Sequence, residues 1–437
     1  MKDAMKRRYS KSPIIQIQPI EGITQSLKEF LMELMNQPFT GQLGNRLIEL
    51  LDSPDYHTLN IIVAFAKNSG VLRIKDSFER FRARDGKVNV YVGVDLGVTS
   101  YEALTALLLC TDSLNVVHSE KGQTFHTKIY QFLGKEKGLI VVGSHNLTGG
   151  GLWTNFESSA LIPVDYSSAS DIEILRAQND YIIRLTSLED SCMPIREKDD
   201  IDKLLNNGYI SKEVSQQVHL TKAATEDGDR ERLFGNGAPA RLPRVAPQDN
   251  EQKVAVLVPP LIAVPVDDEG QTIWFETKRL TGGSRNILDL SKRSLVERGE
   301  PIGTPFDLGE PGFMRGGVEF FGINPTATDH SKDIILNFEG VDYTGNKILF
   351  PDGAHANGTW RLQIKGVSSS GEKITDAFRF KGEDYYLVEK VITFTKIKDD
   401  YYFITVLPES ELEDLKAASR ILARNGSTRT AKWLGLL

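Results

Sequence analysis

The chain has 437 residues, more than one ordinary hydrophobic core accommodates, so two or three domains are expected. Hydrophobic residues make up 40% and charged residues 25% of the sequence, which is the composition of a soluble globular protein. The formal net charge of −7 argues against a protein that coats nucleic acid non-specifically. It leaves room for DNA binding through a local basic patch, because phosphate attraction acts over roughly 8–10 Å at moderate salt.

Targeting and redox signals favour a cytoplasmic protein that does not enter a membrane. No apolar run approaches the roughly 20 residues of a membrane-spanning helix. The basic N-terminus is followed by SPIIQIQPIEGITQ, which lacks the apolar core of a secretion signal. Cys110 and Cys192 lie far apart without CxxC spacing, so neither a disulfide framework nor a cysteine-ligated zinc site is indicated.

The first half of the chain has the pattern of an α/β domain. Residues 1–54 are interpreted as a helical lead-in, since QSLKEFLMELM has apolar residues at helical spacing. Within 55–220, short apolar strands at 59–65, 87–94 and 114–119 alternate with amphipathic helix candidates. Strand-like pieces follow at 124–132, 138–143 and 156–163, and residues 166–220 are expected to be helical. The pattern predicts a mixed sheet flanked by helices.

The second half changes composition twice. Residues 221–252 are rich in Ala, Pro, Gly, Arg and Asp with few large apolar side chains, which indicates an interdomain linker. Beyond it, 253–437 contains short alternating runs such as IILNFEGV, AFRFKG and YYFITVL, separated by Gly- and Asp-containing turns. These runs predict an all-β sandwich or barrel, closed by a helix over ESELEDLKAASRILARN.

The chemistry is concentrated in TFHTKIYQFLGKEKGLIVVGSHNLTGGGLWTNFESS, residues 124–159. His126 and Lys128 are two apart on an expected strand, so they project from one face, roughly 6–7 Å apart. After a turn, the next expected strand ends in Ser144 and Asn146, again two apart. If the two strands are neighbours, an imidazole, an ammonium, a hydroxyl and an amide converge, and Glu157 follows closely.

These groups suit phosphoryl transfer. The neutral imidazole of His126 can attack phosphorus and form a phosphohistidine, which divides one difficult step into two. Lys128 and Asn146 can hold the non-bridging oxygens, and Ser144 can donate a further hydrogen bond. Glu157 can accept the second ring N–H of a histidine and fix its tautomer. HxK alone is more often a solvated strand edge, and GSxN is commonly only a turn, so the order and spacing of the whole set carry the hypothesis.

The succession HxK, GSxNxTxxGL and NxE resembles the half-site of the phospholipase D superfamily, its HKD motif. The resemblance implies a phospholipase D-like fold, with His126 as nucleophile, Lys128 and Asn146 on the phosphate, and Glu157 as the orienting acid. One position departs from the pattern: lipid-hydrolysing members have an aspartate five residues after the lysine, and this chain has Leu133. The aspartate is also absent from metal-independent restriction endonucleases of the BfiI and NgoFVII type, which the chain resembles.

The histidine count predicts a homodimer. Of seven histidines, only His126 lies in HxK, whereas double displacement needs a second imidazole to protonate the leaving oxygen. The second is expected from another copy of the chain, across a two-fold axis. His145, within the GSHN turn, is interpreted as a neighbour without a catalytic role. No metal site is indicated, because no carboxylate cluster accompanies the histidines, and no cofactor is expected.

A basic segment begins the predicted all-β domain. Lys278 and Arg279 can neutralise phosphates, whereas Arg285 and Asn286, after the turn that includes Ser284, can contact guanine and adenine edges. From these residues alone, a solvated basic loop is equally consistent. KRLTGGSRN, followed by strands and NGTWRLQIKG, resembles the plant B3-type DNA-binding pseudobarrel. The resemblance implies a first arm near 278–286 and a second near 361–373, with candidates Arg361, Gln363 and Lys365.

The sequence is therefore interpreted as a type II-like restriction endonuclease that cleaves double-stranded DNA without metal. A phospholipase D-type lipid phosphodiesterase and a DNA-binding protein with an inactive nuclease domain are the alternatives. The sequence leaves open whether a separate ATP-dependent translocase subunit is needed. The chain has no GxxxxGK[ST] motif, so any ATP dependence would belong to another chain.

Overall fold

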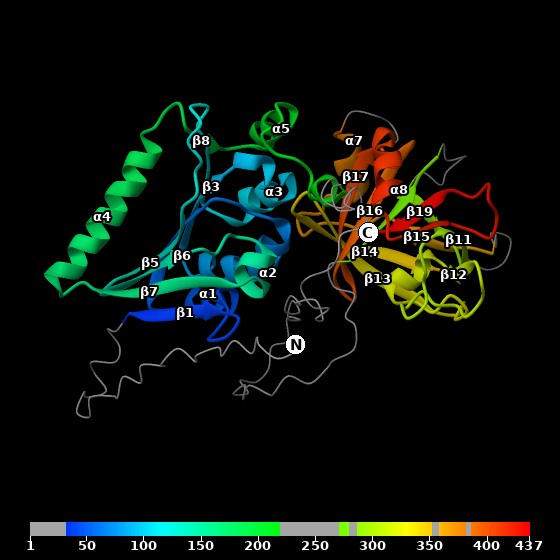
Figure 1. Cartoon of the computed structure of the whole chain (residues 1–437), viewed down its shortest axis with the longest axis horizontal. Helices are drawn as coiled ribbons and strands as arrows, with labels where there is room; N and C mark the ends of the chain where they lie inside the picture. The colour runs from blue at the N-terminus through cyan, green and yellow to red at the C-terminus, as the bar shows by residue number, and fades with distance from the viewer. Residues whose placement is uncertain (1–31, 219–270, 279–285, 352–357, 382–385) are drawn as a thin grey trace, which may run out of the picture.

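The computed structural model describes residues 32–218, 271–278, 286–351, 358–381 and 386–437, and places their strands in two sheets (Figure 1). The first sheet has eight strands. Their spatial order is β1 (Glu33–Gln37), β7 (Glu157–Asp165), β6 (Lys137–Gly143), β5 (Lys128–Gly134), β2 (Tyr56–Val63), β3 (Lys87–Gly93), β4 (Ser113–Val117) and β8 (Cys192–Ile195). Only β2, β3 and β4 run parallel to one another, so the sheet is mixed.

Helices cover both faces of this sheet, because its central strands are apolar on both sides. Ile61 and Val63 of β2 belong to a core shared with α1 (Leu43–Asp52), α2 (Asn68–Arg82), α3 (Tyr101–Cys110) and α5 (Lys198–Asn206). Ile62, which points the other way, packs with Leu185 of α4 (Ala169–Thr186). The expected mixed sheet with flanking helices is confirmed.

The second sheet has eleven strands and lies beside the first (Figure 1). Their order is β10 (Ile287–Leu290), β15 (Trp360–Gln363), β14 (Val341–Leu349), β13 (Ser331–Phe338), β17 (Tyr401–Pro408), β16 (Lys390–Lys398), β9 (Thr272–Glu276), β19 (Trp433–Leu436), β18 (Ile421–Arg424), β11 (Arg293–Arg298) and β12 (Phe313–Arg315). All neighbours are antiparallel except β13 and β17. Two short helices, α7 (Ile374–Arg379) and α8 (Leu412–Ala418), accompany it.

The two sheets meet through apolar and charged contacts. Leu72 of α2 packs against Ile397, Tyr401 and Phe403 of the second sheet. Lys75 of the same helix donates a 2.9 Å hydrogen bond to Asp342. The interface therefore joins the helical layer of the first sheet to β14, β16 and β17.

Four local predictions are wrong. The last residues of QSLKEFLMELM lie in β1, because Met35 and Gln37 alternate inward while Leu34 and Asn36 face out; the rest of that helix lies outside the described residues. Strand β8 interrupts the expected helical region 166–220, although the helices expected on either side of it are present as α4 and α5. The first three residues of AFRFKG do not form a strand but end α7, where Ile374 and Phe378 bury one helical face. The closing helix ends at Ala418, since the following residues pair as β18 with β11 and β19. The expected linker at 221–252 lies outside the described residues.

Candidate active site

Adjacent strand ends bring the five predicted catalytic residues to one edge of the first sheet. Strands β5 and β6 are antiparallel neighbours, with Ile129 opposite Val142, so the beginning of β5 lies beside the end of β6. Strand β7 pairs with the other side of β6, with Gly143 opposite Ser159. The expectation that the two motif-bearing strands are neighbours is confirmed.

His126 and Lys128 contact each other directly at the start of β5. His126 lies two residues before the strand, where its side chain is exposed, and Lys128 is the first strand residue. The Lys128 ammonium lies 2.8 Å from Nδ1 and 2.9 Å from Nε2 of the ring and donates to the His126 carbonyl oxygen at 2.9 Å. Burial lowers the pKa of Lys128, against the opposing effect of the Glu157 charge.

Ser144 and Glu157 form a second linked pair, across the ends of β6 and β7. The Ser144 hydroxyl donates to Glu157 Oε2 and accepts from the backbone N–H of Ser158 at 3.1 Å. The other carboxylate oxygen of Glu157 accepts from Asn155 Nδ2 at 3.2 Å. No hydrogen bond joins Glu157 to His126 among the described residues, so within one copy of the chain Glu157 orients Ser144 rather than the imidazole.

Asn146 is oriented by the backbone of the neighbouring segment. Its Oδ1 accepts from the Phe65 N–H at 3.1 Å, just after β2, so its Nδ2 group is the part left to donate. Leu147 continues this connection through a parallel bridge with Ala66. A Cβ on Gly151 would come within 2.5 Å of the Asn146 carbonyl oxygen, so this turn requires glycine.

His145 faces the opposite way from its neighbours and is buried, with 1% of its surface exposed. Its Nδ1 lies 2.5 Å from the Ser159 hydroxyl, and its carbonyl oxygen accepts from the Tyr130 hydroxyl at 3.2 Å. Burial lowers the pKa of His145 to about 4, although Glu157 acts against the shift. A neutral, enclosed imidazole suits its interpretation as a neighbour without a catalytic role.

Two supporting residues were missed because they are distant in sequence from the motifs. Gln37 of β1 is buried and its Nε2 donates to the carbonyl oxygens of Gly151 and Asn155, at 3.2 and 3.0 Å. Asp95, after β3, accepts from the Phe125 N–H at 2.6 Å and lies 2.6 Å from His118 Nδ1, which fixes the segment that leads to His126. A polar residue at an inward strand position was the only sequence signal for Gln37, and Asp95 had none.

The described DNA-binding candidates gather where β10 pairs with β15. Arg361 lies opposite Asp289, with Nε 3.8 Å from the carboxylate, and Gln363 lies opposite Ile287. The Asn286 carbonyl oxygen accepts from Ile364 N–H, and Lys365 is exposed one residue later. The remaining described candidate, Lys278, lies 3.6 Å from Glu276 at the end of β9. Arg279, Ser284 and Arg285 lie outside the described residues.

Two features are absent from the described residues. No three His, Cys, Asp or Glu side chains in those ranges are grouped as metal ligands would be. No helix within the same ranges has the length and apolar character required to cross a bilayer.

Comparisons with known proteins find similarity only among solved structures: no family model and no curated protein matches the chain. Nuc, a phospholipase D family member from Salmonella typhimurium, is 14% identical over 34% of this chain and 92% of that chain, with a TM-score of 0.27. NucT from Helicobacter pylori is 17% identical, over 38% and 99%, with a TM-score of 0.28. Phosphatidylserine synthase from Haemophilus influenzae Rd KW20 is 10% identical, over 45% and 47%, with a TM-score of 0.31. TM-scores of this size do not establish a common fold, so the functional assignment rests on the site.

Proposed function

We propose that the chain is a phosphodiesterase of the phospholipase D type that cleaves double-stranded DNA at specific sequences, as a restriction endonuclease. The observation that carries the proposal is the contact of Lys128 with His126 beside the Ser144–Glu157 pair and the Asn146 amide. A nucleophile, a cation and two hydrogen-bond donors on adjacent strand ends are what a phosphodiester needs for displacement at phosphorus.

The proposed mechanism has two displacements. In the first, a ring nitrogen of His126 forms a bond to phosphorus while the P–O bond to the leaving nucleoside breaks, and the leaving oxygen takes a proton from a second imidazolium. In the second, water attacks phosphorus, its proton passes to that second imidazole, and the N–P bond breaks. Lys128 and Asn146 would hold the non-bridging oxygens throughout.

The second imidazole would come from a second copy of the chain, and an apolar sheet face beside the site supports such a dimer. Cross-strand register aligns Leu34, Ala160 and Val142 on one face of β1, β7 and β6. Leu34 is 61% exposed and Val142 is 41% exposed. One step further along the same strands the face continues into Asn36, Ser158 and Ser144, so this apolar surface adjoins the catalytic serine.

The dimer would also give Glu157 its orienting role. Within one copy its carboxylate binds Ser144 and Asn155, and the His126 ring contacts Lys128. We infer that the ring N–H meets a Glu157 carboxylate only when two copies assemble around one phosphate. Such an arrangement would leave a monomer inactive although all five residues are present.

Sequence recognition is assigned to the second sheet, as a B3-like DNA-binding domain. Arg361 and Gln363 share the β10–β15 edge with Asn286 and Lys365, and Lys278 follows the end of β9. Cations and amides on one edge can combine phosphate neutralisation with base contacts.

One digestion experiment tests the activity. The full chain is incubated with a fully sequenced plasmid, with magnesium or with excess EDTA, and the ends are mapped. Cleavage at fixed positions is expected in both conditions, and His126→Ala should lower the rate by about a thousandfold or more because no covalent intermediate can form. His57→Ala, which changes an exposed histidine on β2, is the matched control and should retain activity.

Two results would count against the proposal. Retained nicking by His126→Ala would remove this histidine from the mechanism. Hydrolysis of phosphatidylcholine vesicles with no cleavage of plasmid would favour the lipid phosphodiesterase. A slow DNA substrate that traps an acid-labile phosphohistidine on the wild-type chain would exclude an inactive nuclease domain.

A further inference from the structure

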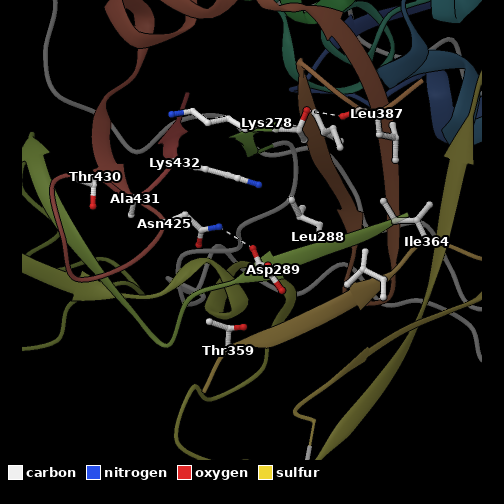
Figure 2. A pocket seen from close by; sticks show the side chains of 13 residues that line it. Lys278, Leu288, Asp289, Thr359, Ile364, Leu387, Asn425, Thr430, Ala431 and Lys432 are labelled. Carbon is white, nitrogen blue, oxygen red and sulfur yellow. Dashed lines mark hydrogen bonds between the residues drawn. The ribbon is translucent and has the colours of Figure 1, made fainter. Parts of the chain in front are cut away.

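A cavity of about 350 Å³ opens in the second sheet, away from the candidate active site (Figure 2). It lies between the ends of β9 and β10, the segments next to β15 and β16, and the loop that joins β18 to β19. Small-molecule sites in proteins occupy roughly 300–1,000 Å³, so this cavity has the size for one small ligand.

The interior of the cavity is apolar and its rim is polar. Leu288, Ile364, Leu387 and Ile392, all buried, form the apolar part. Lys278, Asp289, Asn425 and Lys432 lie around it. Figure 2 shows the Lys432 side chain extending across the cavity towards Leu288, with Asp289 and Asn425 along one side.

Lys432 is the group that most clearly lacks a partner. Both polar atoms of the Asn425 amide have a partner, since Nδ2 donates to the Asp289 carbonyl oxygen at 2.7 Å and Oδ1 accepts from Ser291 N–H at 2.9 Å. The Lys432 ammonium, by contrast, makes no hydrogen bond or ion pair with any of the described residues. Partial burial lowers the pKa of Lys432, against the favourable charges of Asp289 and Glu276. A half-buried ammonium at an open cavity is suited to an acceptor from a ligand.

The neighbouring residues indicate what the ligand is. Asp289 and Ile287, which line the cavity, are the cross-strand partners of Arg361 and Gln363, the candidates for DNA contact. An apolar compound would leave the Lys432 ammonium without an acceptor, and inorganic phosphate would leave the apolar interior unfilled. A nucleotide meets both requirements, an acceptor for Lys432 and a group that fills the apolar interior. Its planar base carries donors and acceptors on the edge, and its sugar carries an anionic phosphate.

We propose that this cavity binds a single nucleotide, with the base against Leu288 and Ile364, the base edge on Lys432 and Asp289, and the phosphate near Lys278. The nucleotide can be free or can be turned out of a DNA duplex. Binding of a nucleotide turned out of a duplex rests on the proposed DNA-binding function of the second sheet. Binding of a free nucleotide does not. Extrusion of a base loses its stacking and pairing in the duplex, which the contacts in the cavity would offset.

The first arm of the test uses free ligands and the full chain. Calorimetric titrations compare dAMP, dGMP, dCMP and TMP with deoxyribose 5-phosphate and inorganic phosphate. At least one mononucleotide should bind about tenfold or more tightly than the two compounds without a base. Lys432→Met and Thr430→Trp, which places an indole at the exposed rim, should each weaken that binding about tenfold or more.

Two controls show whether a loss of nucleotide affinity comes from the cavity itself, from a change in net charge, or from loss of the fold. Lys135→Met removes an exposed lysine from the turn between β5 and β6 and should leave nucleotide affinity unchanged. Thermal unfolding of each variant checks that the fold is retained. Mononucleotides that bind no better than deoxyribose 5-phosphate, or equal affinity in the parent, Lys432→Met and Thr430→Trp, would overturn the proposal.

The second arm of the test shows whether the bound nucleotide is free or belongs to a DNA duplex. A duplex that contains the plasmid cleavage site, with 2-aminopurine at successive positions, should gain fluorescence at one position on binding, and Thr430→Trp should abolish the gain. Free nucleotide binding without such a gain assigns the cavity to mononucleotides. The titration requires no cleavage, so failure of the nuclease proposal in the plasmid assay leaves the titration result intact, and a failed titration leaves the plasmid result intact. The duplex experiment follows once the plasmid assay has mapped a cleavage site.

Discussion

The Lys128 ammonium and the His126 ring are only 2.8–2.9 Å apart, and this contact depends on the exact spacing of two residues at the start of one strand. The other catalytic candidates come from separate strands. At this scale the sequence motif places the imidazole beside the ammonium, because an HxK pair needs no distant partner to bring its two side chains together.

His145 provides a pH test at the residue scale. The folded chain lowers its pKa from 6.5 to about 4, so between these values the unfolded chain binds a proton that the folded chain does not. The stability contributed by the neutral ring is complete above pH 6.5 and is lost as the pH falls towards 4, on the order of 3 kcal/mol in total. Urea unfolding of the parent and His145→Leu should show the parent losing this amount relative to the variant between pH 7 and pH 4.

His57→Leu, at an exposed position of β2, serves as the control and should follow the parent. A constant difference between the parent and His145→Leu across this pH range would show that burial does not hold the ring neutral.

At the scale of elements, the close approach of β6 to β7 positions the turn that contains the candidate residues Ser144 and Asn146. A Cβ on Gly143 would lie 2.0 Å from the Ser159 hydroxyl and 2.3 Å from the Ser158 carbonyl oxygen. Gly143→Ala should therefore separate the two strand ends, lower the free energy of unfolding by about 1–3 kcal/mol and displace Ser144 from Glu157. Plasmid cleavage should fall more than tenfold at a temperature where the variant remains folded.

Lys135→Ala, in the turn that precedes the same strand, is the matched control. Its side chain is exposed at the far end of β6, so truncation should change both stability and cleavage little. Equal cleavage by the parent and Gly143→Ala would indicate that the Ser144 position does not govern the reaction.

At the scale of the whole molecule, the contact between the two sheets encloses acidic groups. Glu213 Oε2 accepts from Asn68 N–H, its own N–H donates to Glu102, and Glu102 accepts from Thr405 of the second sheet. Desolvation, followed by the nearby Glu102 charge, raises the pKa of Glu213 to about 7. The carboxyl group whose pKa is about 7 is therefore linked to the contact between the two halves through its neighbour Glu102.

The sign of the effect follows from this raised pKa. The folded chain holds the Glu213 proton more tightly than the unfolded chain, so stability from this group is complete below pH 4.5 and is lost as the pH rises to about 7. Glu213→Gln cannot lose a proton and should gain on the order of 3 kcal/mol relative to the parent between pH 4.5 and pH 8. Chemical unfolding at the two pH values measures this difference in the free energy of unfolding, and the exposed Glu189→Gln serves as the control. A difference between Glu213→Gln and the parent that does not change with pH would contradict the prediction.

The second prediction for the whole molecule concerns dimer formation through the apolar face of β1. Leu34→Glu places a charge on the exposed apolar face of β1, and burial of a leucine contributes about 1.5–3 kcal/mol. The variant should raise the dimer dissociation constant about tenfold or more in analytical ultracentrifugation, and cleavage per chain should fall with it. Ile302→Glu, at an exposed position next to the second sheet, should affect neither. Full cleavage by monomeric Leu34→Glu would contradict a shared active site.

The sequence by itself determined the mixed sheet and the five catalytic candidates, because strand periodicity and short motif spacings are local properties of the chain. It did not determine β1 or α7, where burial against distant partners overrides local pattern. Only the tertiary structure placed Gln37 beneath the glycine turn, and Asp95 beside the segment that leads to His126. It alone formed the cavity around Lys432, because hydrogen bonds and packing between remote strands depend on the register and topology of the complete sheets.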